Sequence, residues 1–393
     1  MKPPSIMTAS LPATLTFRRA DQWVATGIGD RMGVWVPLFA LAMLWGNATV
    51  ALRWAPPWKK LNERIAGDTR SAADCLRYPD FVRRIGPDEE PGDAIVIDLR
   101  IPMAGLPKGP EGPSTRPHHQ LAFDRVPAIL WWRWKLKGLL PTGSTRLEQF
   151  LAACRRAAYG VQCNPDCVPP AASDLEQLLI LARRRRTPRV FVHLRRGDRF
   201  MGDNQQKQRF ERQTHKRLRA IVKQLAAARA NTGASPPIQW VFMSDDSASA
   251  ETARAVLSAA AAELFLPMDV QMVPPNATVW AFTAFRYASG VVVSCNKDGW
   301  SSFSTVPSLL LGVPLYCVSD NDNPPGGMYA RHSYLPAEAI ALHHRDVQIR
   351  ATLTPSESLS TRKRIALCWT TNEEAGFARA VLQHADETPG ESL

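Results

Sequence analysis

Two adjacent arginines, a glycine and an aspartate directly follow a short apolar run in the sequence VFVHLRRGD, which spans residues 190 to 198. The apolar part, Val190 to Leu194, is rich in β-branched and aromatic residues, which predicts a short buried strand. Arginine stays charged at physiological pH and offers a planar fork of donors, so Arg195 and Arg196 suit a diphosphate. Ligands of open α/β sheets bind at the carboxyl ends of strands, so these charges are expected at a ligand site.

Polar sequences also follow two later predicted strands. MSDD, from Met243 to Asp246, ends one of them, and SCNKDGWSSFS, residues 294 to 304, follows another. Carboxylates at such positions can orient arginines or bond sugar and base hydroxyls, and small hydroxyl residues before a helix can hold phosphate on its N-terminus. The three strand ends therefore indicate one site for an anionic ligand.

These strand ends require a parallel sheet to position them. In the second half of the chain, strands alternate with helices, which implies a parallel, doubly wound sheet. Asp174 is a plausible N-cap for the first of these helices, LEQLLILARRRR. The expected strands are residues 189–195, 238–246, 270–273 and 290–295, and the expected helices are 175–186, 209–230, 248–265, 277–289, 303–312 and 372–385.

The first half opens with residues 1–20, which are rich in Pro, Ser and Thr and predict a loose arm. A glycine-rich turn, TGIGDRMG, precedes a long apolar helix; its backbone N–H groups suit a ligand, and a tight turn into a core helix is an equal alternative. Residues 32–52 have the length of a membrane helix, but Pro37, Gly46 and Asn47 interrupt them, so we expect a buried helix followed by the strand ATVALRW. Residues 56–93 look helical and charged, 94–102 form a strand, 102–117 an exposed loop, and 145–161 a helix.

The composition favours an anionic partner. Lys and Arg outnumber acids 48 to 36, giving a net charge of +12, which suits nucleic acid, a phosphorylated ligand or an anionic membrane. The surplus is diffuse, and runs such as 183–186 and 207–219 are typical of solvated faces. Zinc-finger spacing and RNA-recognition signatures are absent from the sequence, so nucleic acid is not the favoured partner.

The seven cysteines are too scattered for a zinc site, and Cys163 and Cys167 form one disulfide or stay reduced.

The ordered polar sequences resemble a known enzyme family. HLRRGD (193–198) is similar to the HxRRxD motif of the α1,2-, α1,6- and protein O-fucosyltransferases, SDD (244–246) to their second motif and SSFS (301–304) to their third. TGIGDRMG resembles the turn that opens their first domain. The resemblance covers landmarks from about residue 26 to 315, and its most specific part is the order of the three motifs.

The resemblance implies a GT-B architecture, with two Rossmann-like lobes, a cleft between them and the nucleotide in the C-terminal lobe. It also implies metal-independent, inverting transfer of fucose from GDP-fucose. Arg195 and Arg196 would then be catalytic groups at the diphosphate, and Asp203 a proposed base. The donor would be bound by Gly27, Gly29, Asp30, Arg31, His193, Asp198, Asp245, Asp246, Ser301, Ser302 and Phe303.

The sequence departs from the family pattern at one point. The helix before the third strand, TVWAFTAFRYAS, has no acid to read guanine, although Asp298 could replace it. Several residues also have structural alternatives. His193 could be a core histidine, Asp245 and Asp246 could cap a helix, and Asp203 could lie in an inert turn. The tripeptide RGD at 196–198 adjoins a buried strand, which disfavours an adhesion role.

We therefore predict a flexible arm (1–20), an acceptor-side Rossmann-like domain (21–172), a nucleotide-sugar domain (173–340) and a C-terminal segment (341–393) whose helix packs back on the lobes. The expected activity is transfer of fucose to a glycan or protein hydroxyl. The alternative is a noncatalytic protein that binds anions or nucleic acid through its basic surface. The resemblance implies the Golgi or another secretory compartment; membrane association is possible, but the sequence shows no clear signal anchor.

Overall fold

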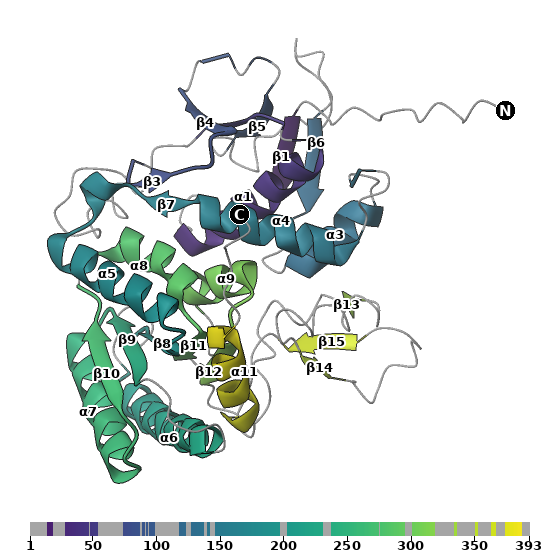
Figure 1. Cartoon of the computed structure of the whole chain (residues 1–393). Helices are drawn as coiled ribbons and strands as arrows, with labels where there is room; N and C mark the ends of the chain where they lie inside the picture. Colours follow the sequence, from purple (N-terminus) through teal and green to yellow (C-terminus); the bar gives the residue numbers. More distant parts are fainter. Residues whose placement is uncertain are drawn as a thin grey trace.

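The computed structural model shows an α/β protein built on two five-stranded parallel sheets (Figure 1). It describes residues 14–18, 28–46, 48–53, 74–86, 89–90, 92, 94–98, 118–122, 127–136, 140–141, 146–196, 203–230, 237–274, 276–294, 301–318, 334–335, 350–352, 363–366 and 374–386.

The second sheet carries the predicted strand ends. Its strands are β8 (Arg189–Leu194), β9 (Ile238–Ser244), β10 (Met268–Met272), β11 (Gly290–Ser294) and β12 (Leu315–Val318). They are all parallel, in the order β10-β9-β8-β11-β12. This confirms the predicted parallel sheet and is a Rossmann-like order. The strand order reverses between β8 and β11, which is where open α/β sheets bind ligands.

Successive strand residues point to opposite faces of this sheet, so each face has its own core. Phe191 and Val293 pack toward α8 (Thr278–Ala284) and α9 (Ser302–Leu311). Val192 and Val292 pack toward the other layer. That layer consists of α6 (Asn204–Ala230), α7 (Ser247–Glu263) and α11 (Glu374–Asp386), and the two layers lie on opposite sides of the sheet in Figure 1.

The helix α5 (Pro170–Arg184) leads into β8. Its N-cap is Pro169 rather than the predicted Asp174, so that boundary was wrong by about one turn. The reason is that proline suits the first helical position, where its missing N–H removes no hydrogen bond. The helix thereby begins within the VPPAASD sequence.

The first sheet consists of β1 (Thr14–Arg18), β2 (Val50–Arg53), β4 (Val82–Ile85), β5 (Ile95–Asp98) and β6 (His118–Ala122), in the parallel order β4-β2-β5-β1-β6. Helix α1 (Ile28–Leu44) precedes β2, as predicted, and α3 (Pro127–Leu136) and α4 (Leu147–Gly160) follow β6. A small antiparallel sheet has the order β13-β15-β14 and is formed by Tyr334–Leu335, Lys363–Ala366 and Arg350–Thr352.

Two expectations for the first half were wrong. Strand β1 lies within the expected loose arm, and the expected helix at 56–93 contains β4 and the short β3 (Leu76–Arg77). In β4 the end residues Val82 and Ile85 are buried while Arg83 and Arg84 are exposed. Such short strands contribute few apolar residues, and the surrounding charges hide them in the sequence pattern.

A disulfide ties the first half of the chain to the segment before α5. Cys75 and Cys167 are bonded with their Cα atoms 5.5 Å apart, which corrects the pairing of Cys167 with Cys163 that the sequence left open. Strand β3 pairs antiparallel with β7 (Gln162–Cys163), and the N–H of Asn164 donates to the Cys75 carbonyl oxygen at 2.8 Å. This pairing brings Cys75 to the short 3₁₀ helix that ends at Cys167. Cys317 is also disulfide-bonded.

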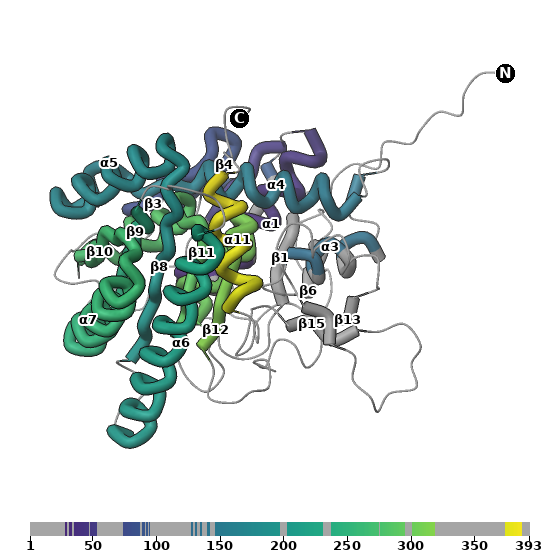
Figure 2. The backbone as a smooth tube through the Cα atoms, turned by 60° about the horizontal axis from the view of Figure 1, so that its bottom comes forward, coloured from purple at the N-terminus to yellow at the C-terminus, as the bar shows by residue number. Residues whose placement is uncertain are grey.

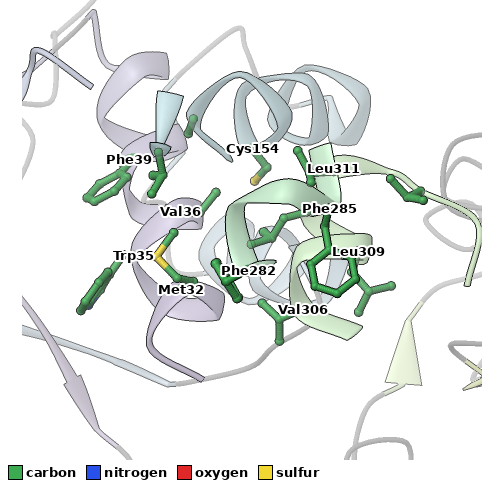
Figure 3. Packing of buried hydrophobic residues seen from close by; sticks show 14 of the residues in the cluster. Met32, Trp35, Val36, Phe39, Cys154, Phe282, Phe285, Val306, Leu309 and Leu311 are labelled. Atoms are coloured by element: carbon green, nitrogen blue, oxygen red, sulfur yellow. The ribbon is translucent and has the colours of Figure 1, made fainter. Parts of the chain in front are cut away.

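Helices from the two halves share one hydrophobic core. Side chains of α1 and α4 point toward those of α8 and α9, as Figure 3 shows. Trp35 and Phe39 of α1 point away from α8 and α9 in Figure 3 and are fully buried, with their ring centroids 6.2 and 6.3 Å from that of Tyr78. Burial on both sides of α1 explains the apolar composition of 32–52. Among the described residues no helix has both the length and the hydropathy needed to cross a membrane. A cavity of about 20 Å³ remains in this core, lined among others by Met32, Thr283 and Arg286.

Candidate active site at the carboxyl ends of β8 and β11

The two predicted arginines lie at the point where the strand order reverses. The backbone N–H of Arg195 donates to the Ser294 carbonyl oxygen at 3.0 Å, which extends the pairing of β8 with β11 by one bond. The side chain of Arg195 is partly exposed. Its charge acts on the buried ring of His193. Arg195 therefore places a cation at the carboxyl edge of the sheet.

Arg196 is instead part of the protein interior, with a relative exposure of 2%. Its guanidinium donates to the Ser294 carbonyl at 2.7 Å, to the Ser294 hydroxyl at 2.9 Å and to the Thr214 hydroxyl at 3.0 Å. These bonds join the ends of β8 and β11 to helix α6. The expectation that both guanidinium groups face one ligand is therefore not met in this structure, because successive strand residues point to opposite sides.

The SDD aspartates fix the backbone beside the arginines. Asp245 is exposed, and its Oδ1 accepts from the Arg196 backbone N–H at 2.6 Å. Asp246 is the N-cap of α7 and accepts from the backbone N–H groups of Ala248 and Ser249. It also pairs with Lys207 of α6. Burial raises the pKa of Asp246, but hydrogen bonds from Lys207 and Ser249 outweigh it and hold the pKa below its usual value.

His193 connects the arginine strand to α9. Its Nδ1 lies 2.9 Å from the Ser304 hydroxyl, and its ring lies 5.3 Å from the Phe303 ring. Burial lowers the pKa of His193 to about 3, with further lowering from the charges of Arg195 and Arg196. The histidine is therefore neutral at physiological pH, and its role is to join β8 to the first turn of α9.

The SSFS motif forms the N-terminus of α9. Ser301 is its N-cap residue and is 1% exposed, and Thr305 lies one turn later and is fully buried. Neither hydroxyl has a hydrogen-bond partner among the residues that the structure describes. Residues four apart lie on one face of a helix. Buried hydroxyls normally have partners, so these two are polar groups that the described part of the chain leaves unsatisfied.

The expected glycine-rich turn is wrong from Ile28 onward, because these residues form the first turns of α1, which meet the SSFS motif. A Cβ on Gly29, in the first turn of α1, would overlap the backbone of Ser302 and Phe303. The N-termini of α1 and α9 therefore touch, which neither motif alone predicts. Arg31 is 7% exposed in the same turn. Gly27, Asp198, Asp298 and the side chain of Asp30 lie outside the described residues.

Asp203 serves as a helix cap in this structure. It is exposed, and its Oδ1 accepts from the Gln206 backbone N–H at 2.8 Å, at the start of α6. This matches the structural alternative for a solvated turn more closely than a catalytic geometry. Its role as a base stays a prediction.

Several participants were not singled out from the sequence. Thr214 and Thr305 are small hydroxyl residues in helical contexts, and only tertiary contact distinguishes them. Ser294 and Ser304 lay within the quoted SCNKDGWSSFS sequence but were given no role of their own. Lys207 stood within a charge run that predicted a solvated face. Among the described residues no cluster of three or more His, Cys, Asp or Glu side chains is arranged to hold a metal ion.

Comparisons with known proteins give limited similarity. No protein-family model matches the chain, and no curated protein matches it by sequence. Among solved structures, it is similar to the NodZ α1,6-fucosyltransferase soaked with GDP-fucose, with 12% identity and a TM-score of 0.35, over 77% of this chain and 94% of that one. It is also similar to the N-terminal domain of the Candida albicans trehalose-6-phosphate phosphatase, with 10% identity and a TM-score of 0.24, over 98% of this chain and 95% of that one. The fold itself is a mixed α/β fold with a Rossmann-like parallel sheet.

Proposed function

We propose that this protein is a nucleotide-sugar glycosyltransferase of GT-B architecture that transfers fucose from GDP-fucose to a glycan or protein hydroxyl. The observation that carries the proposal is the contact of the N-termini of α1 and α9 at the end of the sheet where Arg195 lies. The order of the HLRRGD, SDD and SSFS motifs supports the fucosyltransferase assignment.

The donor diphosphate fits this location on physical grounds. A helix N-terminus presents unpaired N–H groups and a partial positive charge, and two such ends reinforce each other. The hydroxyls of Ser301 and Thr305 supply two donors that lack partners in the described residues. Arg195 supplies a permanent charge and a planar fork of donors for the phosphate oxygens.

In the proposed reaction the acceptor hydroxyl oxygen attacks the anomeric carbon of the sugar on the face opposite the diphosphate. The new carbon–oxygen bond forms as the bond to the β-phosphate oxygen breaks, which inverts the anomeric centre. GDP leaves with the bonding electron pair, and Arg195 and the two helix N-termini stabilise its developing charge. A carboxylate accepts the acceptor proton. Arg196, His193 and Asp245 act by positioning the strand ends.

Calorimetric titration with GDP, ADP, UDP and GDP-fucose tests this proposal. We expect binding that prefers GDP over equally charged nucleotides and that survives moderate salt. A noncatalytic basic protein would instead bind the diphosphates equally and lose affinity steeply with salt. Failure of every guanosine nucleotide to bind overturns the donor assignment.

A further inference from the structure

Two helices end in the same unusual way at the amino end of the second sheet. Arg186 follows α5 with φ 54°, and Phe265 follows α7 with φ 50°. The next residue in each case closes the helix, because Thr187 donates to the Ala182 carbonyl at 2.8 Å and Leu266 to that of Ala261 at 2.9 Å. Glycine is the usual residue at this left-handed position, since a Cβ crowds the following carbonyl.

Phe265 departs from two folding rules at once. It occupies a left-handed backbone conformation, and its side chain is 94% exposed. The exposed ring contributes almost nothing to the core, and glycine would satisfy the turn with less strain. A strained backbone conformation and an exposed aromatic ring that folding does not require indicate that Phe265 has a role in binding.

The two turns lie at the same edge of the sheet, one on each face, because α5 packs in the core with α8 and α9 and α7 packs in the core of the opposite layer. The Pro188 carbonyl accepts from Gln239 at 2.9 Å, and the Pro267 carbonyl accepts from Ile238 at 3.0 Å, so both turns flank the start of β9. Strands β8 and β10 are the two neighbours of β9, which places their first residues about 10 Å apart.

Charged and apolar side chains gather around these turns. Leu181 of α5 and Leu264 beside Phe265 are 42% and 40% exposed. We call the amino-edge patch the following set of exposed residues: Leu181, Arg184, Arg185, Arg186, Leu264 and Phe265. Glu263 is exposed next to it and contributes one opposing charge.

We propose that the amino-edge patch docks on an anionic lipid surface. The three arginines match negatively charged headgroups, and Phe265 inserts its ring at the boundary with the acyl chains. The combination of a basic run and a protruding aromatic residue favours a lipid surface over a folded protein partner, whose contact would require a larger apolar area. The patch lies at the end of the sheet opposite Arg195, so docking leaves the candidate active site open to solvent.

The test is sedimentation of the full chain with phosphatidylcholine vesicles that contain or lack phosphatidylserine. We expect binding only to the anionic vesicles, weakened by salt. F265G should fold at least as well as the unchanged protein and lose most of the binding. Arg185→Gln should weaken it about fivefold, which corresponds to one basic residue near an anionic surface. Arg146→Gln, an exposed arginine in the first half of the chain, is the matched control.

Phe265→Trp separates insertion from a structural effect. The indole should retain vesicle binding, and its fluorescence should shift to shorter wavelength on anionic vesicles. Vesicle binding by F265G equal to that of the unchanged protein overturns the proposal. So does failure of the unchanged protein to bind anionic vesicles at low salt, and the patch would then be assigned to a protein partner. Nucleotide binding by F265G should be unchanged, which keeps this test independent of the proposed function.

Discussion

The guanidinium of Arg196 donates to both the carbonyl and the hydroxyl of Ser294, at 2.7 and 2.9 Å, and so joins the end of β8 to the end of β11. This contact lies where the strand order of the sheet reverses. Arg196 therefore has a structural role, whereas the neighbouring Arg195 is partly exposed and can contact a ligand.

The first prediction compares lysine variants of these two arginines. Arg196→Lys should lower the free energy of unfolding by about 2 to 4 kcal/mol, because an ammonium cannot replace three divergent bonds in a buried site. Arg195→Lys should melt normally and lose roughly 10² to 10³ in transfer rate. Arg185→Lys, in the exposed run, should change neither. Melting curves and GDP-release assays on the three variants measure this. A normal melting curve for Arg196→Lys contradicts the positioning role.

The second prediction concerns the unpartnered hydroxyls of α9. Thr305→Val keeps the side-chain shape and removes a buried hydroxyl, so the ligand-free protein should gain about 1 kcal/mol of stability. The same variant should bind GDP more weakly, by about fivefold or more, if the hydroxyl contacts phosphate. Ser301→Ala should behave alike. Denaturant unfolding and calorimetry measure the two effects, and unchanged GDP affinity in both variants would remove these hydroxyls from the site.

The third prediction tests the contact between the two helix N-termini. Gly29→Ala places a methyl group against the Ser302 backbone, so the helices must separate, at a cost of about 1 to 3 kcal/mol. We expect lower stability and loss of nucleotide binding together. Gly86→Ala is the control, since a Cβ there meets its nearest atoms at 3.8 and 3.9 Å. Equal behaviour of the two variants argues against the contact.

The fourth prediction concerns acid stability. The unfolded chain binds a proton at His193 below pH 6.5, while the folded protein does so only near pH 3. Stability therefore falls as the pH drops from 6.5, by up to about 2 kcal/mol at pH 5. His193→Asn preserves a partner for Ser304 and cannot be protonated, so its stability should depend less on pH. Part of the dependence remains, because burial and nearby arginines lower the pKa of His384 to about 4. Unfolding at pH 5 and 7.5 compares the two proteins, and identical slopes contradict the assignment.

The fifth prediction concerns the disulfide between Cys75 and Cys167, which closes a separation of 92 residues. Cys75→Ser should destabilise the protein by roughly 3 to 4 kcal/mol, since a long loop regains its freedom in the unfolded chain. Cys154→Ser is a contrasting variant, because burial raises the pKa of that thiol and it is not disulfide-bonded. The change in stability caused by Cys154→Ser should be the same in reducing and in oxidising buffer. In reducing buffer, Cys75→Ser and the unchanged protein should unfold at the same denaturant concentration. A difference that survives reduction would contradict a disulfide origin.

The sequence predicted four of the five strands of the second sheet, most clearly those that are continuous apolar runs, and it did not predict β12. Buried parallel strands such as β8 and β11 are recognisable in the sequence as continuous apolar runs. Their carboxyl ends could be located from the polar residues that follow. The first sheet was predicted less well, since β1 and β4 add few apolar residues and lie in polar surroundings.

The site could be predicted as a location and not as a set of roles. The motifs predicted that Arg195, Asp245 and Ser301 lie at the carboxyl edge of the second sheet. The direction of each side chain, however, depends on tertiary packing. The inward turn of Arg196, the capping by Asp246 and the contact of Gly29 with Ser302 all arise from residues far apart in the chain. Hydrogen-bond partners at that separation leave no local pattern.

Helix α11 packs on the strands of the second sheet, beside α6, in Figures 1 and 2. Phe377 lies 5.5 Å from the Tyr316 ring, and Val381 leaves no room for a side chain at Gly290. During synthesis, the part of this face over β11 and β12 therefore stays open until the codons for α11 have been translated. A ribosome that stalls between residues 320 and 370 would hold a chain whose sheet lacks the cover of α11 over β11 and β12, and such a chain is a natural client for chaperones.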